Sequence, residues 1–169
     1  MDLLDRLLGH DAWTTRQLLL LSLDLDDEQL DRAFDIGHKT LRATFRHLIG
    51  NMEVWTDLLR ERPVRAPSDP RGQASSIAGL LTRLDAIAPD FAALATGIRD
   101  TGRWDALWTD VLDDPPQQKT YGGAIVHLIT HSMHHRSELL HILARLGVPD
   151  LPEGDLLGWE LRHNATPHA

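Results

Sequence analysis

The chain has 169 residues, a length that suits a single domain spanning residues 1–169. Its formal net charge is −8 and its basic residues are scattered, which argues against nucleic acid as a partner because phosphate binding needs a concentrated positive face. It contains no cysteine, which excludes disulfides, thiolate nucleophiles and zinc fingers. No apolar run approaches the roughly 20 residues of a membrane span, and the acidic start MDLLDRLLGH does not resemble a secretory signal. We therefore expect a cytoplasmic protein with no membrane or nucleic-acid partner.

Long amphipathic segments dominate the sequence and predict an all-α fold. The first helix should run from about residue 2 to residue 22. The stretch DDEQLDRAF follows and predicts a short helical connector capped by an aspartate. A second long helix is expected from about residue 39 to residue 61, ended by Pro63.

A stretch rich in proline, glycine and serine, RPVRAPSDPRGQASS, separates the second helix from the third and predicts a loop. Ser75 or Ser76 then caps a third helix that covers about residues 77–98. Pro89 lies inside this helix and should kink or split it, because proline removes one hydrogen bond of the helical ladder.

The last third of the chain begins with a weak pattern over residues 100–118, which is expected to form a short helix or a packed connector through Trp104, Leu107, Trp108, Val111 and Leu112. A fourth helix should begin near residues 122–124 and end at Gly147, with Pro149 just beyond. In the tail, the side chains expected to pack back on the body are Leu156, Leu157 and Trp159. Four amphipathic helices in one domain predict a helical bundle.

The fourth helix carries five histidines, which its periodicity separates by face. At about 100° per residue, His135 falls within the apolar stripe and His131 at its edge, so both should point into the bundle. His127, His134 and His141 fall on the outward shoulder, where His134 and His141 are expected in solvent and His127 could contact a substrate. An inward pair four residues apart can bind one metal ion, or it can consist of core histidines bonded to carbonyl groups or water.

A second apolar stripe on the same helix consists of Val126, Met133, Leu140 and Ala144. A helix that is apolar on two sides is either central in its bundle or part of a dimer interface. We favour the interface, and so expect a homodimer.

Two imidazoles rarely make a tight metal site, so another helix should contribute a ligand. His47 shares a polar line with Thr40, Thr44 and Asn51, next to the core stripe of the second helix. Such a line can border a cavity between helices, although this pattern alone favours a surface histidine on the shoulder of the helix.

The combination of RHLIGNMEVW in the second helix with HLITHSMHHRSEL in the last resembles the DinB/YfiT-like family of metal-binding four-helix bundles. The segments WTTRQLL, TYGG and EGDLLGWE add to the resemblance. The resemblance implies an up-down-down-up four-helix bundle with a long crossover loop, frequent homodimers, and a divalent metal held by His47, His131 and His135. The similarly named DNA polymerase is unrelated.

One departure from the family pattern is visible after the second histidine of the pair. Family members often have HRGQ or HRAQ there, whereas this chain has Arg136, Ser137 and Glu138. Glu138 could approach the ion, alter the metal preference or lie in solvent, and we expect the last of these.

Three neutral imidazoles leave a coordination position open, which is typical of catalytic metal sites. The resemblance implies a metal-dependent thiol S-transferase that uses a low-molecular-weight thiol and acts on a small electrophilic molecule. Zinc or nickel is the expected metal, with iron as a third candidate. The alternatives are a non-catalytic metal-binding stress-response protein and a metal-dependent hydrolase. The candidates for lining the substrate pocket are Asn51, Trp55, Tyr121, His127, Glu138 and Trp159.

Overall fold

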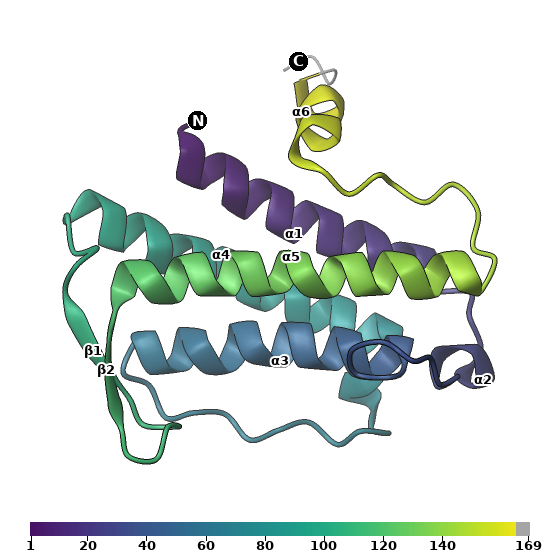
Figure 1. The fold of residues 1–169 in the computed structure, drawn as a ribbon, viewed down its shortest axis with the longest axis horizontal. Coiled ribbons are helices and arrows are strands. Elements are labelled where there is room, and N and C mark those ends of the chain that lie inside the picture. Colours follow the sequence, from purple (N-terminus) through teal and green to yellow (C-terminus); the bar gives the residue numbers. More distant parts are fainter. Residues whose placement is uncertain (165–169) are drawn as a thin grey trace.

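The computed structural model describes residues 1–164 and is mostly helical (Figure 1). The long helices are α1 (Leu3–Leu21), α3 (Leu41–Leu59), α4 (Ile77–Asp100) and α5 (Tyr121–Arg145). The short elements are the helices α2 (Asp27–Leu30) and α6 (Leu156–Asn164), the 3₁₀ turn η1 (Gln73–Ser75), and the strands β1 (Leu107–Asp110) and β2 (Gln117–Thr120). The predicted long helices therefore exist with boundaries within a few residues of those expected.

Helix starts are fixed by short polar side chains that accept hydrogen bonds from backbone N–H groups three residues further on. The capping residues are Asp2 for α1, Asp26 for α2, Thr40 for α3, Ser76 for α4 and Thr120 for α5. Each satisfies one of the N–H groups that a helix leaves free at its start. The predicted aspartate cap of the connector and the predicted serine cap of the third helix are both confirmed.

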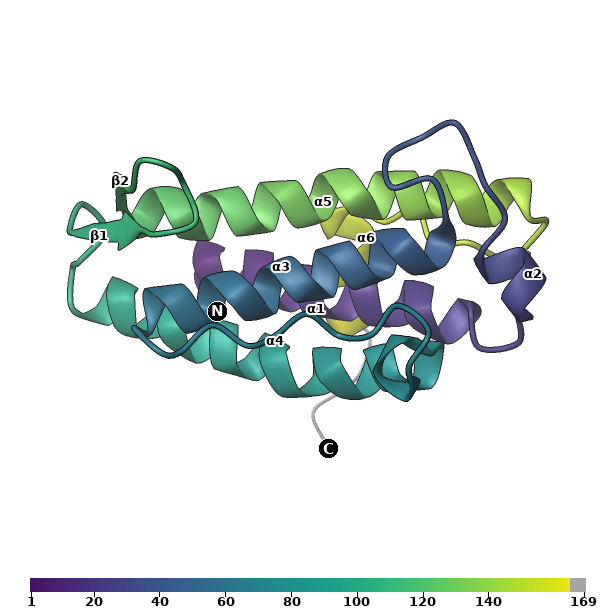
Figure 2. The ribbon, with the colours of Figure 1, turned by 90° about the horizontal axis from the view of Figure 1, so that it is seen from below.

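The long helices pack side by side, with α1 and α3 each lying against both α4 and α5. Helices α3 and α4 run in one direction and α1 and α5 in the other (Figures 1 and 2). Residues 60–76 return along α3 to connect its end with the start of α4 (Figure 2). The largest fully buried side chains come from all four helices and form one core: Leu18, Leu19, Leu41, Phe45, Ile49, Leu80, Leu84, Ile87, Ile125, Leu139, Ile142 and Leu143.

Helix α4 continues through Pro89 without a break, so of the two expected effects, a kink or a split, the split does not occur. Ile87 and Phe91, on either side of the proline, are both buried in the core. Packing of this apolar face offsets the missing hydrogen bond, because tertiary contacts supply most of the stability of a helix in a protein.

Residues 107–120 form an antiparallel hairpin and not the short helix that was one of the two expectations. Trp108 lies opposite Lys119, is buried, and donates a hydrogen bond from Nε1 to the Thr120 carbonyl at 3.3 Å. Leu107, Val111 and Leu112, which were expected to pack, are instead exposed. Strands of four residues are too short for their alternation to be recognised in the sequence.

Helix α6 packs on α1 through Trp159. Its indole ring lies over Gly9, where an added Cβ would come within 2.8 Å of the ring, so only glycine allows this approach. Leu156 is half-buried, but Leu157 is exposed, which corrects the expectation that it packs on the body. Within residues 1–164 no helix has both the length and the apolar character needed to cross a membrane.

A buried ion pair joins α5 to α1 at the level of the histidines. Arg136 Nη1 donates to Asp11 Oδ1 and, at 2.9 Å, to Ser132 Oγ. Both charged side chains are only 3% exposed. Any rotation of α5 that separates the two side chains would leave both charges buried and uncompensated. The pair therefore fixes the orientation of α5 relative to α1.

The substitution Asp11→Ala should therefore lower the free energy of unfolding by about 3–5 kcal/mol. The matched control is Asp85→Ala, which breaks the exposed Arg16–Asp85 pair and should cost no more than about 1 kcal/mol. Urea titrations followed by circular dichroism measure both values. Equal losses in the two variants would contradict the role assigned to the buried pair.

Candidate metal centre

Two lines of side chains, each with a spacing of four residues, face each other where α3 packs on α5. They are His47, Asn51 and Trp55 on α3, and His127, His131 and His135 on α5. Because the two helices run in opposite directions, the first member of one line lies opposite the last member of the other. The ring centroids of His47 and His135 are 4.7 Å apart, and Asn51 Nδ2 lies 3.5 Å from His131 Nδ1.

The histidines expected to bind metal bring their Nε2 atoms close together. His131 Nε2 lies 3.2 Å from His135 Nε2 and 3.5 Å from His47 Nε2. A tetrahedral ion with metal–nitrogen bonds of about 2.0–2.1 Å places its ligand nitrogens about 3.3 Å apart. These three imidazoles therefore have the donor chemistry and the spacing of a site for a divalent metal.

Glu138 orients one of these imidazoles. It is buried, and its Oε2 accepts a hydrogen bond of 2.7 Å from His135 Nδ1. The expectation that Glu138 lies in solvent is therefore wrong, because the loop before α3 covers it so closely that a Cβ on Gly37 would collide with the carboxylate. A carboxylate on one nitrogen fixes the tautomer and leaves the other nitrogen free for an ion.

The solvent-side neighbour of this carboxylate is His134, whose Nε2 lies 3.2 Å from Glu138 Oε1. His134, His135 and Glu138 thus make a second group whose ligand atoms lie close enough to hold a metal. In this group His135 would have to use Nδ1, which is already bonded to Glu138. We therefore assign the ion to the group formed by His47, His131 and His135, in which His135 uses Nε2. His134 and His141 are both exposed, as the helical periodicity predicts.

His38, in the loop before α3, is a neighbour of the cluster that the sequence did not predict. Its ring centroid lies 3.8 Å from that of His47 and 5.1 Å from that of His135. Ligand atoms of His38, His47 and His135 all lie within 4.8 Å of one another. No helical periodicity extends to this loop, so its position could not be derived from spacing.

The electrostatics of the cluster keep His47 and His131 uncharged at neutral pH. Burial, followed by repulsion from His38, His135 and His131, lowers the pKa of His47 to about 4. Burial, followed by repulsion from His135 and His127, likewise lowers the pKa of His131 to about 4. At neutral pH these rings are therefore neutral, which is the form that coordinates a metal.

An aromatic cavity of about 450 Å³ adjoins the cluster at the end nearer the hairpin. It is lined by Trp55, Lys119, Thr120, Gly123, Ala124 and His127. The rings of Trp55 and His127 are 5.0 Å apart, and the His127 ring lies 5.2 Å from that of His131. Two of the residues expected to line a pocket thus lie together beside the proposed ligands.

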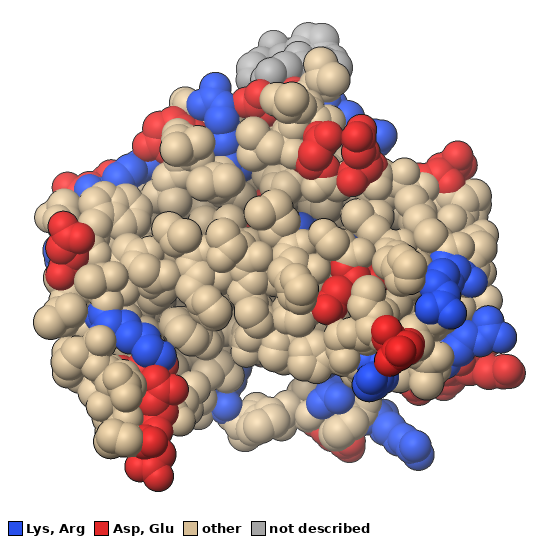
Figure 3. Space-filling model, in the orientation of Figure 1, with Lys and Arg blue, Asp and Glu red and all other residues tan. Residues whose placement is uncertain are grey.

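An arginine-lined cavity of about 330 Å³ lies between α3 and residues 60–76, the crossover segment, with His47 and Asn51 in its wall. Figure 3 shows an opening between the body of the molecule and the segment that runs below α3. The charged residues of this cavity are Arg46, Glu53, Arg65 and Arg83. Asn51 Nδ2 lies 3.2 Å from His47 Nε2, so this cavity also reaches the cluster.

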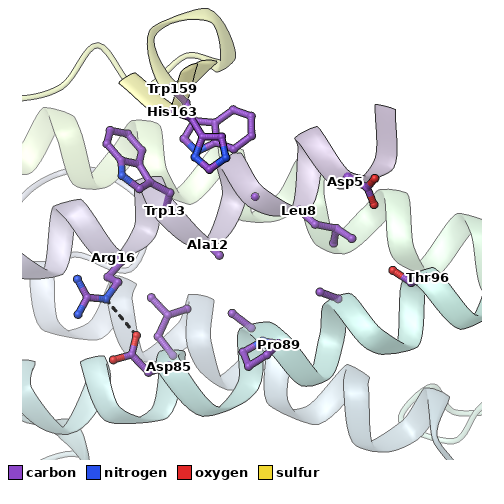
Figure 4. A pocket seen from close by; sticks show the side chains of 14 residues that line it. Asp5, Leu8, Ala12, Trp13, Arg16, Asp85, Pro89, Thr96, Trp159 and His163 are labelled. Carbon is purple, nitrogen blue, oxygen red and sulfur yellow. Dashed lines mark hydrogen bonds and ion pairs between the residues drawn. The ribbon is translucent and has the colours of Figure 1, made fainter. Parts of the chain in front are cut away.

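Tyr121 and Trp159 are not part of this site, which corrects two of the expected pocket residues. Tyr121 is buried near the end of α3, with the Arg103 guanidinium 4.7 Å above its ring. Trp159 borders an apolar groove of about 510 Å³ between α1, α4 and α6, near Trp13 and His163 (Figure 4). None of the clustered histidines lines that groove.

A mostly helical fold and a cluster of histidines between two antiparallel helices define the class of protein: a helical protein with a candidate histidine metal centre. The sequence model of the DinB superfamily matches residues 10–139, so the chain belongs to that superfamily. The matched region contains the four clustered histidines and Glu138, and it ends before α6. A comparison with curated proteins found no match.

The substitution Glu138→Ala should weaken metal binding by about 10–100-fold, because the ring of His135 loses the partner that fixes its tautomer. Competition between the protein and a chelator for zinc measures this affinity. The control is Glu153→Ala, which removes an exposed carboxylate outside the cluster. A Glu138→Ala protein with unchanged zinc affinity would refute the positioning role.

Proposed function

We propose that this protein is a divalent-metal-dependent thiol S-transferase that acts on a small electrophilic molecule. The observation that carries the proposal is a cluster of three imidazoles with two separate cavities beside it. A transferase of this kind needs room on both sides of the metal, one space for the thiol and one for the electrophile. The directions of the long helices support the family's up-down-down-up four-helix bundle as the scaffold.

A divalent ion held by His47, His131 and His135, zinc or nickel before iron, would stabilise the thiolate form of a bound thiol. Asn51 lies between His47 and His131, where its amide can hold a polar group of the substrate in place. The sulfur then forms a bond to carbon as the leaving group departs with its bonding electrons. Solvent takes up the thiol proton.

The aromatic cavity suits the electrophile. Trp55 and His127 offer ring faces on which a flat or apolar molecule can pack. Lys119 lies 5.6 Å from the Trp55 ring centroid and is held by Asp110 and Asp113, each at 2.7 Å. Because its charge is already paired, the cavity selects for shape and apolar surface more than for a negative charge.

The arginine-lined cavity suits a thiol that carries a carboxylate. Arg83 is paired with Glu53 through two hydrogen bonds of 3.0 and 2.6 Å, and Arg65 is paired with Asp57 in the same way. Arg46, in contrast, donates to the Ser68 carbonyl at 3.1 Å and has no carboxylate partner among the described residues.

The charge of Arg46 is therefore free to pair with a ligand. Arg46 and His47 both line this cavity, so one small molecule could place its anionic group at Arg46 and its sulfur near His47.

The two alternative functions make different use of the same cluster. In a non-catalytic metal-binding stress-response protein the ion only ties α3 to α5, and the adjoining cavities have no purpose. A metal-dependent hydrolase would use activated water and need no second cavity for a thiol. The presence of both cavities favours the transferase.

We also propose a homodimer formed through the outer face of α5. Val126 is 59% and Met133 49% exposed, and Figure 3 shows an uncharged surface over the first half of this helix. Exposed apolar side chains on an uncharged surface can become buried when two protein copies associate. Cytoplasmic location stays a prediction from the sequence.

His47→Ala, His131→Ala and His135→Ala should each lose most of the bound metal, because two remaining imidazoles make a weak site. Elemental analysis of proteins purified without a histidine tag measures this directly. In the wild type, a chelator should abolish transfer of a thiol to a chromogenic aryl halide, and zinc or nickel should restore it. Full metal content in all three variants would rule out the site, and full activity without metal would rule out the mechanism.

Arg46→Gln should raise the KM for mercaptosuccinate by about tenfold or more, because a charge-assisted hydrogen bond is lost. The KM for the neutral 2-mercaptoethanol and the kcat for either thiol should change little. Arg71→Gln removes the same charge from an exposed position in the crossover segment and serves as the control. If the KM rose equally for mercaptosuccinate and for 2-mercaptoethanol, Arg46 would not recognise the carboxylate.

Met133→Glu combined with Val126→Glu should convert the dimer to a monomer, because two buried charges would face each other across the interface. Size-exclusion chromatography with light scattering gives the mass in solution. Leu157→Glu places a charge on an equally exposed apolar residue of α6 and should leave the mass unchanged. A wild-type protein that is already monomeric would disprove the interface.

A further inference from the structure

The loop that carries His38 is held tightly against the cluster. Phe34 N–H donates to the Lys39 carbonyl at 2.7 Å, and Lys39 N–H donates to the Ile36 carbonyl at 2.9 Å. Phe34 is buried and lies under the Arg145 guanidinium, which is 4.8 Å from its ring centroid. The loop is thus fastened to the end of α5 and runs close to α3 and α5 (Figure 2).

The backbone on both sides of His38 adopts an unusual conformation. Gly37 has a φ of +44° and Lys39 a φ of +72°. The left-handed region costs a non-glycine residue such as Lys39 roughly 1 kcal/mol or more. Gly37 is also required by space, because a Cβ there would collide with the carboxylate of Glu138. These two residues bend the chain so that the imidazole between them reaches His47.

We propose that His38 is a fourth imidazole ligand of the metal, carried on this loop. The proposal rests on the metal centre proposed above and extends it from three ligands to four. His38, His47 and His135 already have ligand atoms within 4.8 Å of one another, and His131 lies within 3.5 Å of His47. Four nitrogen donors complete a tetrahedral shell, which closes the site.

His38 differs from the other three ligands in how it is held. His135 is buried and bonded to Glu138, and His47 and His131 are half-buried on long helices. His38 is exposed and belongs to a loop. It is therefore the ligand that an incoming thiol can replace, so the open position needed for transfer arises when the His38 side chain leaves the ion.

Zinc affinity tests the assignment. His38→Ala should bind zinc at least about tenfold more weakly than the wild type. Loss of a residue that only hydrogen-bonds a ligand already lowers metal affinity by about tenfold or more, and loss of a ligand should cost no less. His141→Ala, which removes an exposed histidine of α5, should bind zinc as the wild type does. X-ray absorption of the zinc-loaded wild type should show four imidazole nitrogens, and His38→Ala should show three nitrogens and one oxygen.

Trypsin tests the loop, which contains cleavage sites at Arg32 and Lys39. Zinc should slow cleavage at these residues in the wild type and have no such effect in His38→Ala. The assignment of His38 as a fourth ligand would be overturned if His38→Ala had the same zinc affinity, the same X-ray absorption spectrum and the same protection from trypsin by zinc as the wild type. If His47→Ala, His131→Ala and His135→Ala still lose zinc in that case, the three-histidine site survives. Zinc retained by every variant would overturn both proposals.

Discussion

The packing of α3 on α5 is the contact on which the candidate site depends. Each helix contributes polar and aromatic side chains every fourth residue, and opposite directions bring the two lines into register. Either line alone is a row of side chains on the shoulder of a helix. Facing each other, they create a cluster of nitrogen donors next to two cavities.

Buried imidazoles are costly unless both ring nitrogens find a partner, and this requirement explains much of the chemistry of the site. Burial and mutual repulsion lower the pKa of His47 and His131 to about 4, so these rings carry free lone pairs at neutral pH. Glu138 satisfies one nitrogen of His135 and leaves the other directed at the cluster. A divalent ion would satisfy the remaining nitrogens together.

Stability and site geometry are coupled through adjacent residues of α5. Arg136 pairs with Asp11 of α1 on one face, and His135 points toward α3 on the neighbouring face. Because consecutive helical residues are separated by about 100°, fixing Arg136 against α1 also fixes the direction of His135. The buried ion pair therefore supports the candidate metal centre without touching it.

Helical periodicity and capping residues determined the long helices, and the inward direction of His135 followed from its place in the apolar stripe of α5. These features are local, since side chains a few residues apart on one helix set them. His47 could be named only through the family resemblance, because its position on the wheel favours the surface. The burial of Glu138, the hairpin at residues 107–120 and the approach of His38 were decided by tertiary structure. Each depends on contacts between segments far apart in the chain, and a loop has no period from which such a contact can be predicted.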